Sequence, residues 1–124
     1  MQLTAEDRFA IQDVLTKYCV LMDLQDETWV DIFADDATLV VRGDPVRHKA
    51  DLEQFFRDAK RGLHLTSPPL IRPGDSPETA HSTQTFLFRN AQTELFRVGY
   101  YEDELVRRDG TWRFLVRRVE FLDV

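Results

Sequence analysis

The sequence predicts an α+β domain in which about three N-terminal helices pack on a curved, mostly antiparallel sheet. Three observations support this fold class. Apolar residues recur at helical spacing through most of the first half of the chain. In the second half apolar and polar residues alternate with a period of two, and Asp109-Gly110 is a hairpin signal. Helices followed by strands are typical of α+β domains, and a strongly curved sheet with helices on its concave side would enclose a pocket.

Thr4 and Asp7 form a capping arrangement that predicts a first helix running to about Leu24. Thr28 is expected to cap a short second helix. A third helix is expected to have Lys and Arg in its last turn and to end at Gly62 in the left-handed conformation. The apolar stripe of this third helix consists of Leu52, Phe55, Phe56, Ala59 and Leu63.

The strands are expected mainly after Gly62, where the period changes. One short β-branched strand precedes them at residues 38–41, after a turn at 34–37 and before a break at 43–45. Pro68-Pro69 must lie at an edge or bulge, because proline cannot donate to a strand ladder. The remaining strands are expected at residues 64–72, 79–90, 94–107 and 111–122.

The size and composition fit one domain, residues 1–124, with a substantial core. The chain is 43% hydrophobic, and nine Phe, three Tyr and two Trp can fill a core and line a cavity. Sixteen Lys and Arg against 22 Asp and Glu give a formal charge of −6. Because nucleic acids and anionic membranes are bound largely by cationic surfaces, we expect neither as a partner.

Cys19 is the single cysteine and lies in a helical apolar pattern, so it is expected to be a small buried hydrophobe. The N-terminal residues are polar, and no apolar run is long enough to span a bilayer. A cytoplasmic protein is therefore expected. Neither a metal nor another cofactor is expected, since the three histidines show no ligand spacing and no phosphate loop occurs.

Four segments resemble the SnoaL-like domains of the NTF2-like superfamily. They include the sequence Phe-Ala-Asp-Asp-Ala, a strand that opens with a histidine, and the Asp-Gly-x-Trp hairpin. The resemblance covers nearly the whole chain and implies a cone-shaped fold around a pocket. It leaves the chemistry open, because this fold hosts enzymes, binding proteins and structural subunits. The matching segments are residues 10–23, 29–37, 64–71 and 99–114.

A subgroup of this superfamily shares an aspartate near the end of the first helix and a histidine that opens a strand. It comprises scytalone dehydratase, the bile-acid 7α-dehydratases and the hexachlorocyclohexane dehydrochlorinase. Asp23 and His64 match these two positions, Tyr18 matches a tyrosine of the bile-acid enzymes, and Arg117 matches an arginine on the last strand. The resemblance implies an elimination, in which a base removes a proton and a neighbouring group leaves.

His64, Asp23 and Tyr18 are therefore the predicted catalytic residues. Imidazole is the natural base near neutral pH, and a carboxylate can fix its tautomer. The alternative is an exposed histidine after a turn and a solvated aspartate at a helix end. Tyr18 is either a hydroxyl donor to the substrate or a core tyrosine. It lies about 140° from Asp23 on an ideal helix, so the two can serve one site only if the helix loosens near Asp23 or if they reach the cavity from different sides.

Four further residues are predicted to bind substrate. Arg117 lies on an apolar strand face, so it sits at the pocket edge or is paired internally. His81 faces the pocket only if the strand face that carries it lines the pocket. Otherwise it is a surface histidine. Trp29 and Phe33 are expected in the aromatic wall. The expected substrate is small and hydrophobic, with aromatic or polycyclic character.

Three functions remain open at this stage. The first is a cofactor-independent lyase of the dehydratase type. The second is a polyketide cyclase or a ketosteroid-isomerase-like enzyme, although Val41 stands where the isomerase has its catalytic aspartate. The third is a non-catalytic structural or binding protein like the small subunits of ring-hydroxylating dioxygenases. Self-association as a dimer or trimer is expected to cover the outer sheet face, and sedimentation showing only a 14.5 kDa species would contradict it.

Overall fold

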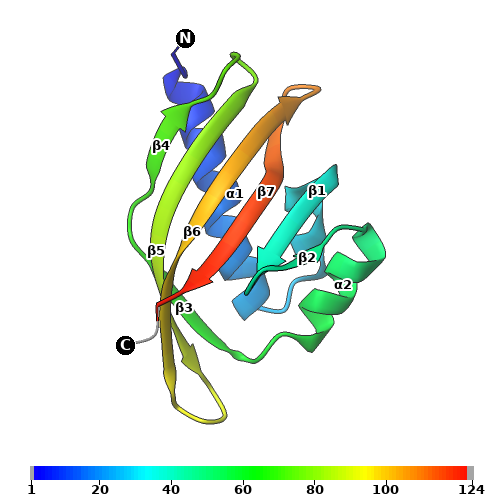
Figure 1. Cartoon of the computed structure of the whole chain (residues 1–124), viewed down its shortest axis with the longest axis vertical. Coiled ribbons are helices and arrows are strands. Elements are labelled where there is room, and N and C mark those ends of the chain that lie inside the picture. The colour runs from blue at the N-terminus through cyan, green and yellow to red at the C-terminus, as the bar shows by residue number, and fades with distance from the viewer. Residues whose placement is uncertain (1, 123–124) are drawn as a thin grey trace.

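The computed structural model describes residues 2–122, and its main layer is a strongly curved seven-stranded sheet (Figure 1). The strand order is β2-β1-β7-β6-β5-β3, with β4 also paired to β5. Helix α1 crosses one face of this sheet, and α2 lies beyond its β1–β2 end (Figure 1). The predicted α+β class is therefore confirmed. The elements are α1 (Ala5–Asp23), the 3-10 helix η1 (Glu27–Ile32), β1 (Phe33–Val41), β2 (Asp44–Val46), α2 (Lys49–Asp58), β3 (Gly62–Thr66), β4 (Leu70–Pro73), β5 (Thr79–Asn90), β6 (Phe96–Arg108) and β7 (Thr111–Phe121).

Strands β5, β6 and β7 form the predicted antiparallel meander. The turn at Asp109-Gly110 has positive φ angles of 52° and 76°, as a tight hairpin requires. Strand β1 pairs in parallel with β7 and extends the sheet on the side of β7 opposite β6. This pairing brings residues from both ends of the chain onto one curved surface.

The strand β2 was not predicted, because residues 43–45 read as the end of a strand rather than as a hairpin. Arg42 and Gly43 have positive φ angles of 54° and 81° and turn the chain back on itself. Arginine is not a usual residue for this conformation, so no local pattern at residues 42–43 indicated the turn. Residues 34–37 belong to β1 rather than to a turn, although the pairing with β7 is irregular there.

Two predicted helix boundaries were wrong. The cap of η1 is Asp26, whose Oδ1 accepts a hydrogen bond from the Thr28 backbone N–H at 2.9 Å. Helix α2 ends at Asp58, and Gly62 opens β3 without a positive φ. A Cβ at Gly62 would collide with the Arg89 carbonyl and the Phe88 ring on β5. The glycine thus permits close strand packing instead of stopping a helix.

The core lies between α1 and the concave face of the sheet. Trp29 is fully buried, and its Nε1 donates to the Tyr18 carbonyl at 3.0 Å. Cys19 is buried as expected, and burial raises the pKa of its thiol to about 11. The buried residues of α1 recur at helical spacing, which holds its apolar face on the sheet: Ile11, Val14, Leu15, Tyr18, Cys19 and Met22.

Replacing Asp7 by alanine should lower the free energy of unfolding by about 2 kcal/mol at neutral pH. Asp7 accepts from the Thr4 backbone N–H at 3.1 Å and from Trp112 Nε1 at 3.1 Å, so the predicted capping box is present. These hydrogen bonds, the first from Thr4, hold the pKa of Asp7 below its usual value. Urea unfolding of the native protein, Asp7→Ala and the exposed control Asp13→Ala would measure the loss.

Because the pKa of Asp7 is lowered in the folded state, its stabilisation is present above the usual carboxyl pKa and disappears as pH falls through the lowered value. The gap between the native protein and Asp7→Ala should therefore narrow below about pH 4. An equal loss in Asp13→Ala, or a gap that stays constant with pH, would contradict this role.

Candidate functional site

A cavity of about 300 Å³ lies between the C-terminal ends of the two α-helices and the concave face of the sheet. Larger grooves of about 610 and 630 Å³ occur elsewhere, but polar and charged side chains dominate their linings. The smaller cavity has mostly aromatic and aliphatic walls, as small-molecule sites usually do. Its lining residues are Tyr18, Met22, Val41, Phe55, Asp58, Ala59, Lys60, His64, Phe86, Phe88, Tyr101, Val119 and Phe121.

His64 and Asp23 meet at one end of this cavity. His64 Nδ1 lies 2.6 Å from Asp23 Oδ1, and the His64 backbone N–H donates to Asp23 Oδ2 at 2.7 Å. Asp23 is the last residue of α1, and His64 lies on the edge strand β3. In the described part of the chain the backbone N–H of His64 has no partner on another strand, which leaves it free to donate to Asp23. The side chains are only 14% and 9% exposed. One carboxylate therefore fixes both the backbone and the ring of His64.

This contact determines which ring nitrogen of His64 can act as a base. A carboxylate only accepts hydrogen bonds, so Nδ1 carries the proton in the neutral imidazole. Nε2 then keeps its lone pair, and within residues 2–122 no hydrogen bond occupies it. A histidine oriented by a carboxylate, with its second nitrogen free beside an apolar cavity, has the arrangement of a general base.

Tyr18 also lines the cavity, from the face of α1 that packs on the sheet. Burial raises the pKa of its hydroxyl, so the group stays protonated and can donate a hydrogen bond. Among the described residues no hydrogen-bond partner is found for that hydroxyl. Asp23 is not itself part of this lining: it contacts His64 on β3, while Tyr18 lines the cavity.

Tyr101 is a second cavity tyrosine, and sequence reasoning missed it. Its ring stacks on Phe86 with centroids 4.5 Å apart, and its hydroxyl lies 3.7 Å from Cys19 Sγ. Burial raises the pKa of this hydroxyl as well. The alternation along β6 places Gly99, Tyr101 and Asp103 on one face, but the sequence did not show which face of the sheet is concave.

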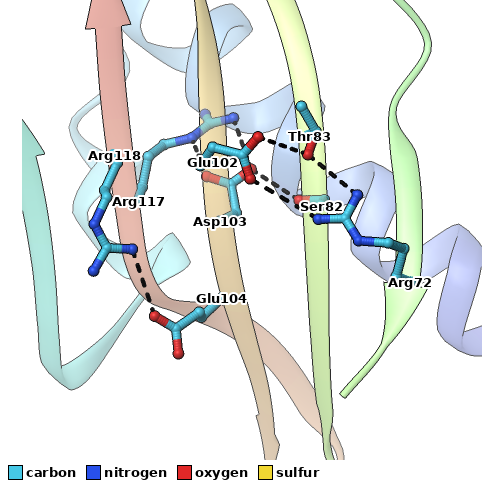
Figure 2. A network of polar contacts seen from close by, with 8 residues as sticks. All are labelled: Arg72, Ser82, Thr83, Glu102, Asp103, Glu104, Arg117 and Arg118. Carbon is cyan, nitrogen blue, oxygen red and sulfur yellow. Dashed lines mark hydrogen bonds and ion pairs between the residues drawn. The ribbon is translucent and has the colours of Figure 1, made fainter.

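Arg117 is paired internally, which is one of the two placements its sequence context allowed. It is fully buried, and its guanidinium donates to Asp103 at 2.8 and 3.3 Å (Figure 2). The Ser82 hydroxyl donates to the same carboxylate at 2.8 Å. Burial raises the pKa of Asp103, whereas Arg117 acts in the opposite direction. Arg117 therefore serves a buried network and is not part of the cavity lining.

The Arg117 guanidinium nevertheless lies directly behind the cavity tyrosines. Its Cζ is 3.7 Å from the Tyr101 ring centroid and 4.3 Å from that of Tyr18. Its Nη1 is buried without a hydrogen-bond partner in the described part of the chain. The positive charge counteracts the effect of burial on the Tyr18 hydroxyl. Arg117 thus acts on the site through the Tyr18 and Tyr101 rings. Direct contact between Arg117 and the substrate stays a prediction.

The other predicted substrate-binding residues lie away from the cavity surface. Trp29 is buried behind Tyr18 and Phe55. Phe33 borders the 610 Å³ groove. His81 alternates with Ser82, which bonds to buried Asp103, so it faces the convex side of β5. Substrate contact with Trp29 and Phe33 stays a prediction, whereas His81 has the second placement that its sequence context allowed, outside the cavity.

Within residues 2–122 no cluster of three or more His, Cys, Asp or Glu side chains is arranged to hold a metal ion. In the same range no helix has the length and apolar character needed to cross a membrane.

Comparisons with known proteins agree with this architecture. A family model described as a SnoaL-like domain matches residues 3–118. A variant of Rv3472 from Mycobacterium tuberculosis, a protein of unknown function, has a TM-score of 0.84 and 25% identity, covering 94% of this chain and 72% of that chain. A search of curated proteins found no match.

Two similar structures are named for elimination reactions. The hexachlorocyclohexane dehydrochlorinase LinA-type3 from Novosphingobium barchaimii has a TM-score of 0.81 and 19% identity, covering 94% of this chain and 86% of that chain. A scytalone dehydratase-like protein from Novosphingobium aromaticivorans has a TM-score of 0.76 and 18% identity, covering 94% and 84%. At these identities the similarity shows a shared fold.

Proposed function

Because this chain belongs to the SnoaL-like domain family, we propose that it is a cofactor-independent lyase that eliminates a small leaving group from an apolar substrate. The observation that carries this proposal is the 2.6 Å contact between His64 and Asp23 beside an apolar cavity. The dehydrochlorinase and dehydratase names of two structures with the same fold favour elimination over cyclisation or isomerisation.

The reaction would begin at His64 Nε2. This nitrogen removes a proton from the carbon next to a carbonyl group of the substrate, and Asp23 stabilises the imidazolium that forms. The electron pair of the broken C–H bond forms the new carbon–carbon double bond as the leaving group departs from the adjacent carbon. When the leaving group is hydroxide, the proton held by His64 completes a water molecule.

Tyr18 would assist by donating a hydrogen bond to the substrate oxygen on which negative charge develops. Its hydroxyl is protonated, and its ring is held by contacts with Trp29 and Tyr101 at centroid distances of 5.4 Å. A donor fixed before the reaction costs little reorganisation in the transition state. The apolar walls strengthen this interaction by excluding water.

The aldol adduct of benzaldehyde and acetone offers a direct assay, because its dehydration gives the conjugated ketone benzylideneacetone, which absorbs ultraviolet light. Native protein should accelerate this dehydration. Tyr18→Phe should lower kcat about 10- to 100-fold with little change in KM, since the lost hydrogen bond strengthens in the transition state.

Tyr100→Phe is the matched control, because Tyr100 lies opposite Thr85 and Glu120 on the convex face. It should retain native activity. The proposal fails for this substrate class if native protein does not accelerate the dehydration. The role of Tyr18 fails if both phenylalanine variants behave alike.

Self-association and a cytoplasmic location stay predictions from the sequence. Three exposed apolar side chains lie on the convex face toward the β3 edge: Leu63 and Leu65 on β3, and Phe96 on β6, with β5 between the two strands. A second copy of the chain would bury apolar surface at this patch.

A further inference from the structure

Two arginines flank one aromatic wall of the cavity. Phe121, the last residue of β7, lines the cavity. Arg42 Cζ lies 4.2 Å from the Phe121 ring centroid, and Arg97 Cζ lies 5.8 Å from it. Both arginines are exposed, and Lys60 adds a third cation to the cavity lining. The mouth of the cavity therefore has three positive charges in a chain whose formal charge is −6.

These three cations have no acidic partner among residues 2–122. None of them forms an ion pair or a side-chain hydrogen bond there. Asp58 is the carboxylate at the cavity mouth, and its Oδ1 accepts from Gln54 Nε2 at 2.9 Å. By contrast, the convex-face arginines Arg72 and Arg118 are each paired with a glutamate (Figure 2). The positive charges at the mouth are thus not neutralised by ion pairs of the kind that Arg72 and Arg118 form.

Contact with Phe121 does not use up the binding capacity of the arginines. Stacking occupies the flat face of a guanidinium and leaves its N–H donors free at the edge. Those donors match the paired oxygens of a carboxylate or phosphate group. The packing on Phe121 also limits the side-chain freedom of Arg42, which lowers the entropic cost of binding.

We propose that the substrate carries an anionic group, a carboxylate or a phosphate, which Arg42 and Arg97 bind at the mouth with Lys60 nearby. This inference rests on the proposed use of the cavity and adds a class of substrate. The apolar part would extend inward along Phe86, whose ring lies 5.8 Å from Phe121 and 6.4 Å from His64. Anchoring one end in this way orients the reacting carbon toward His64.

Two ligands of matched shape test the inference at equilibrium, without turnover. Cinnamate has a carboxylate where benzylideneacetone has an uncharged acetyl group. In isothermal titration calorimetry at low salt, native protein should bind cinnamate about five- to thirtyfold more tightly than the ketone. The variant R42Q/R97Q should lose this preference while binding the ketone as before. Arg118→Gln, which removes a charge from the convex face, should keep the preference.

A styrylphosphonate ligand distinguishes the two possible anions. Tighter binding of the phosphonate points to a phosphate group, and tighter binding of cinnamate points to a carboxylate. Salt should weaken either preference by screening. Equal binding of cinnamate and ketone, a preference that survives in R42Q/R97Q, or no binding of any ligand would overturn the inference. The elimination proposal is tested separately, because these titrations do not depend on proton transfer.

Discussion

Replacing His64 by asparagine should lower kcat/KM for the dehydration about 10²- to 10⁴-fold. Asparagine keeps a polar side chain of similar width but has no nitrogen that can accept a proton at neutral pH. The backbone N–H at this position still donates to Asp23, so the end of α1 remains attached to β3. The loss should therefore reflect the missing base. Initial rates with the benzaldehyde–acetone adduct measure it.

His81→Asn is the matched control for this variant. His81 is also a strand histidine, but it lies on the convex face of β5, opposite Glu104. It should keep native kcat and KM, while circular dichroism verifies that both variants fold. Near-native activity in His64→Asn would exclude the general-base role, and an equal loss in His81→Asn would indicate a general effect on the fold.

Replacing Asp103 by alanine should lower the free energy of unfolding by about 3–5 kcal/mol. The change leaves Arg117 fully buried with no carboxylate and removes the acceptor of the Ser82 hydroxyl. An uncompensated buried charge is among the most destabilising defects in a protein. Urea unfolding at neutral pH measures the loss.

The neighbouring strand position offers a control on the same sheet. Glu104 faces the convex side, where its Oε2 lies 3.6 Å from Arg118 Nη1 and both side chains are more than 40% exposed (Figure 2). Glu104→Ala should cost less than about 1 kcal/mol. Similar losses in the two variants would show that the Asp103–Arg117 pair has no special importance for stability.

The sequence was informative wherever local rules decide the structure. The capping box at Thr4 and Asp7 gave the start of α1, and strand β5 has the predicted bounds. Contacts between distant segments decided the features that local rules did not predict. Gly62 is required by the approach of Phe88 and Arg89 from another strand, which no local pattern reports.

The same division applies to the site. Asp23 and His64 were selected by chemistry and family resemblance, and they do lie in contact. Tyr101 and Asp103 were missed because alternation along a strand does not identify the concave face. The pairing of Arg117 depended on Asp103, a residue on another strand, so the sequence left both placements open.

Hydrogen–deuterium exchange tests the central claim most directly, because it isolates proton removal from departure of the leaving group. Benzylacetone has the same carbon skeleton as the model substrate but no hydroxyl to eliminate. In deuterated buffer, nuclear magnetic resonance should show that native protein speeds the loss of its protons next to the carbonyl, whereas His64→Asn does not. Equal exchange rates with the two proteins would contradict His64 as the base.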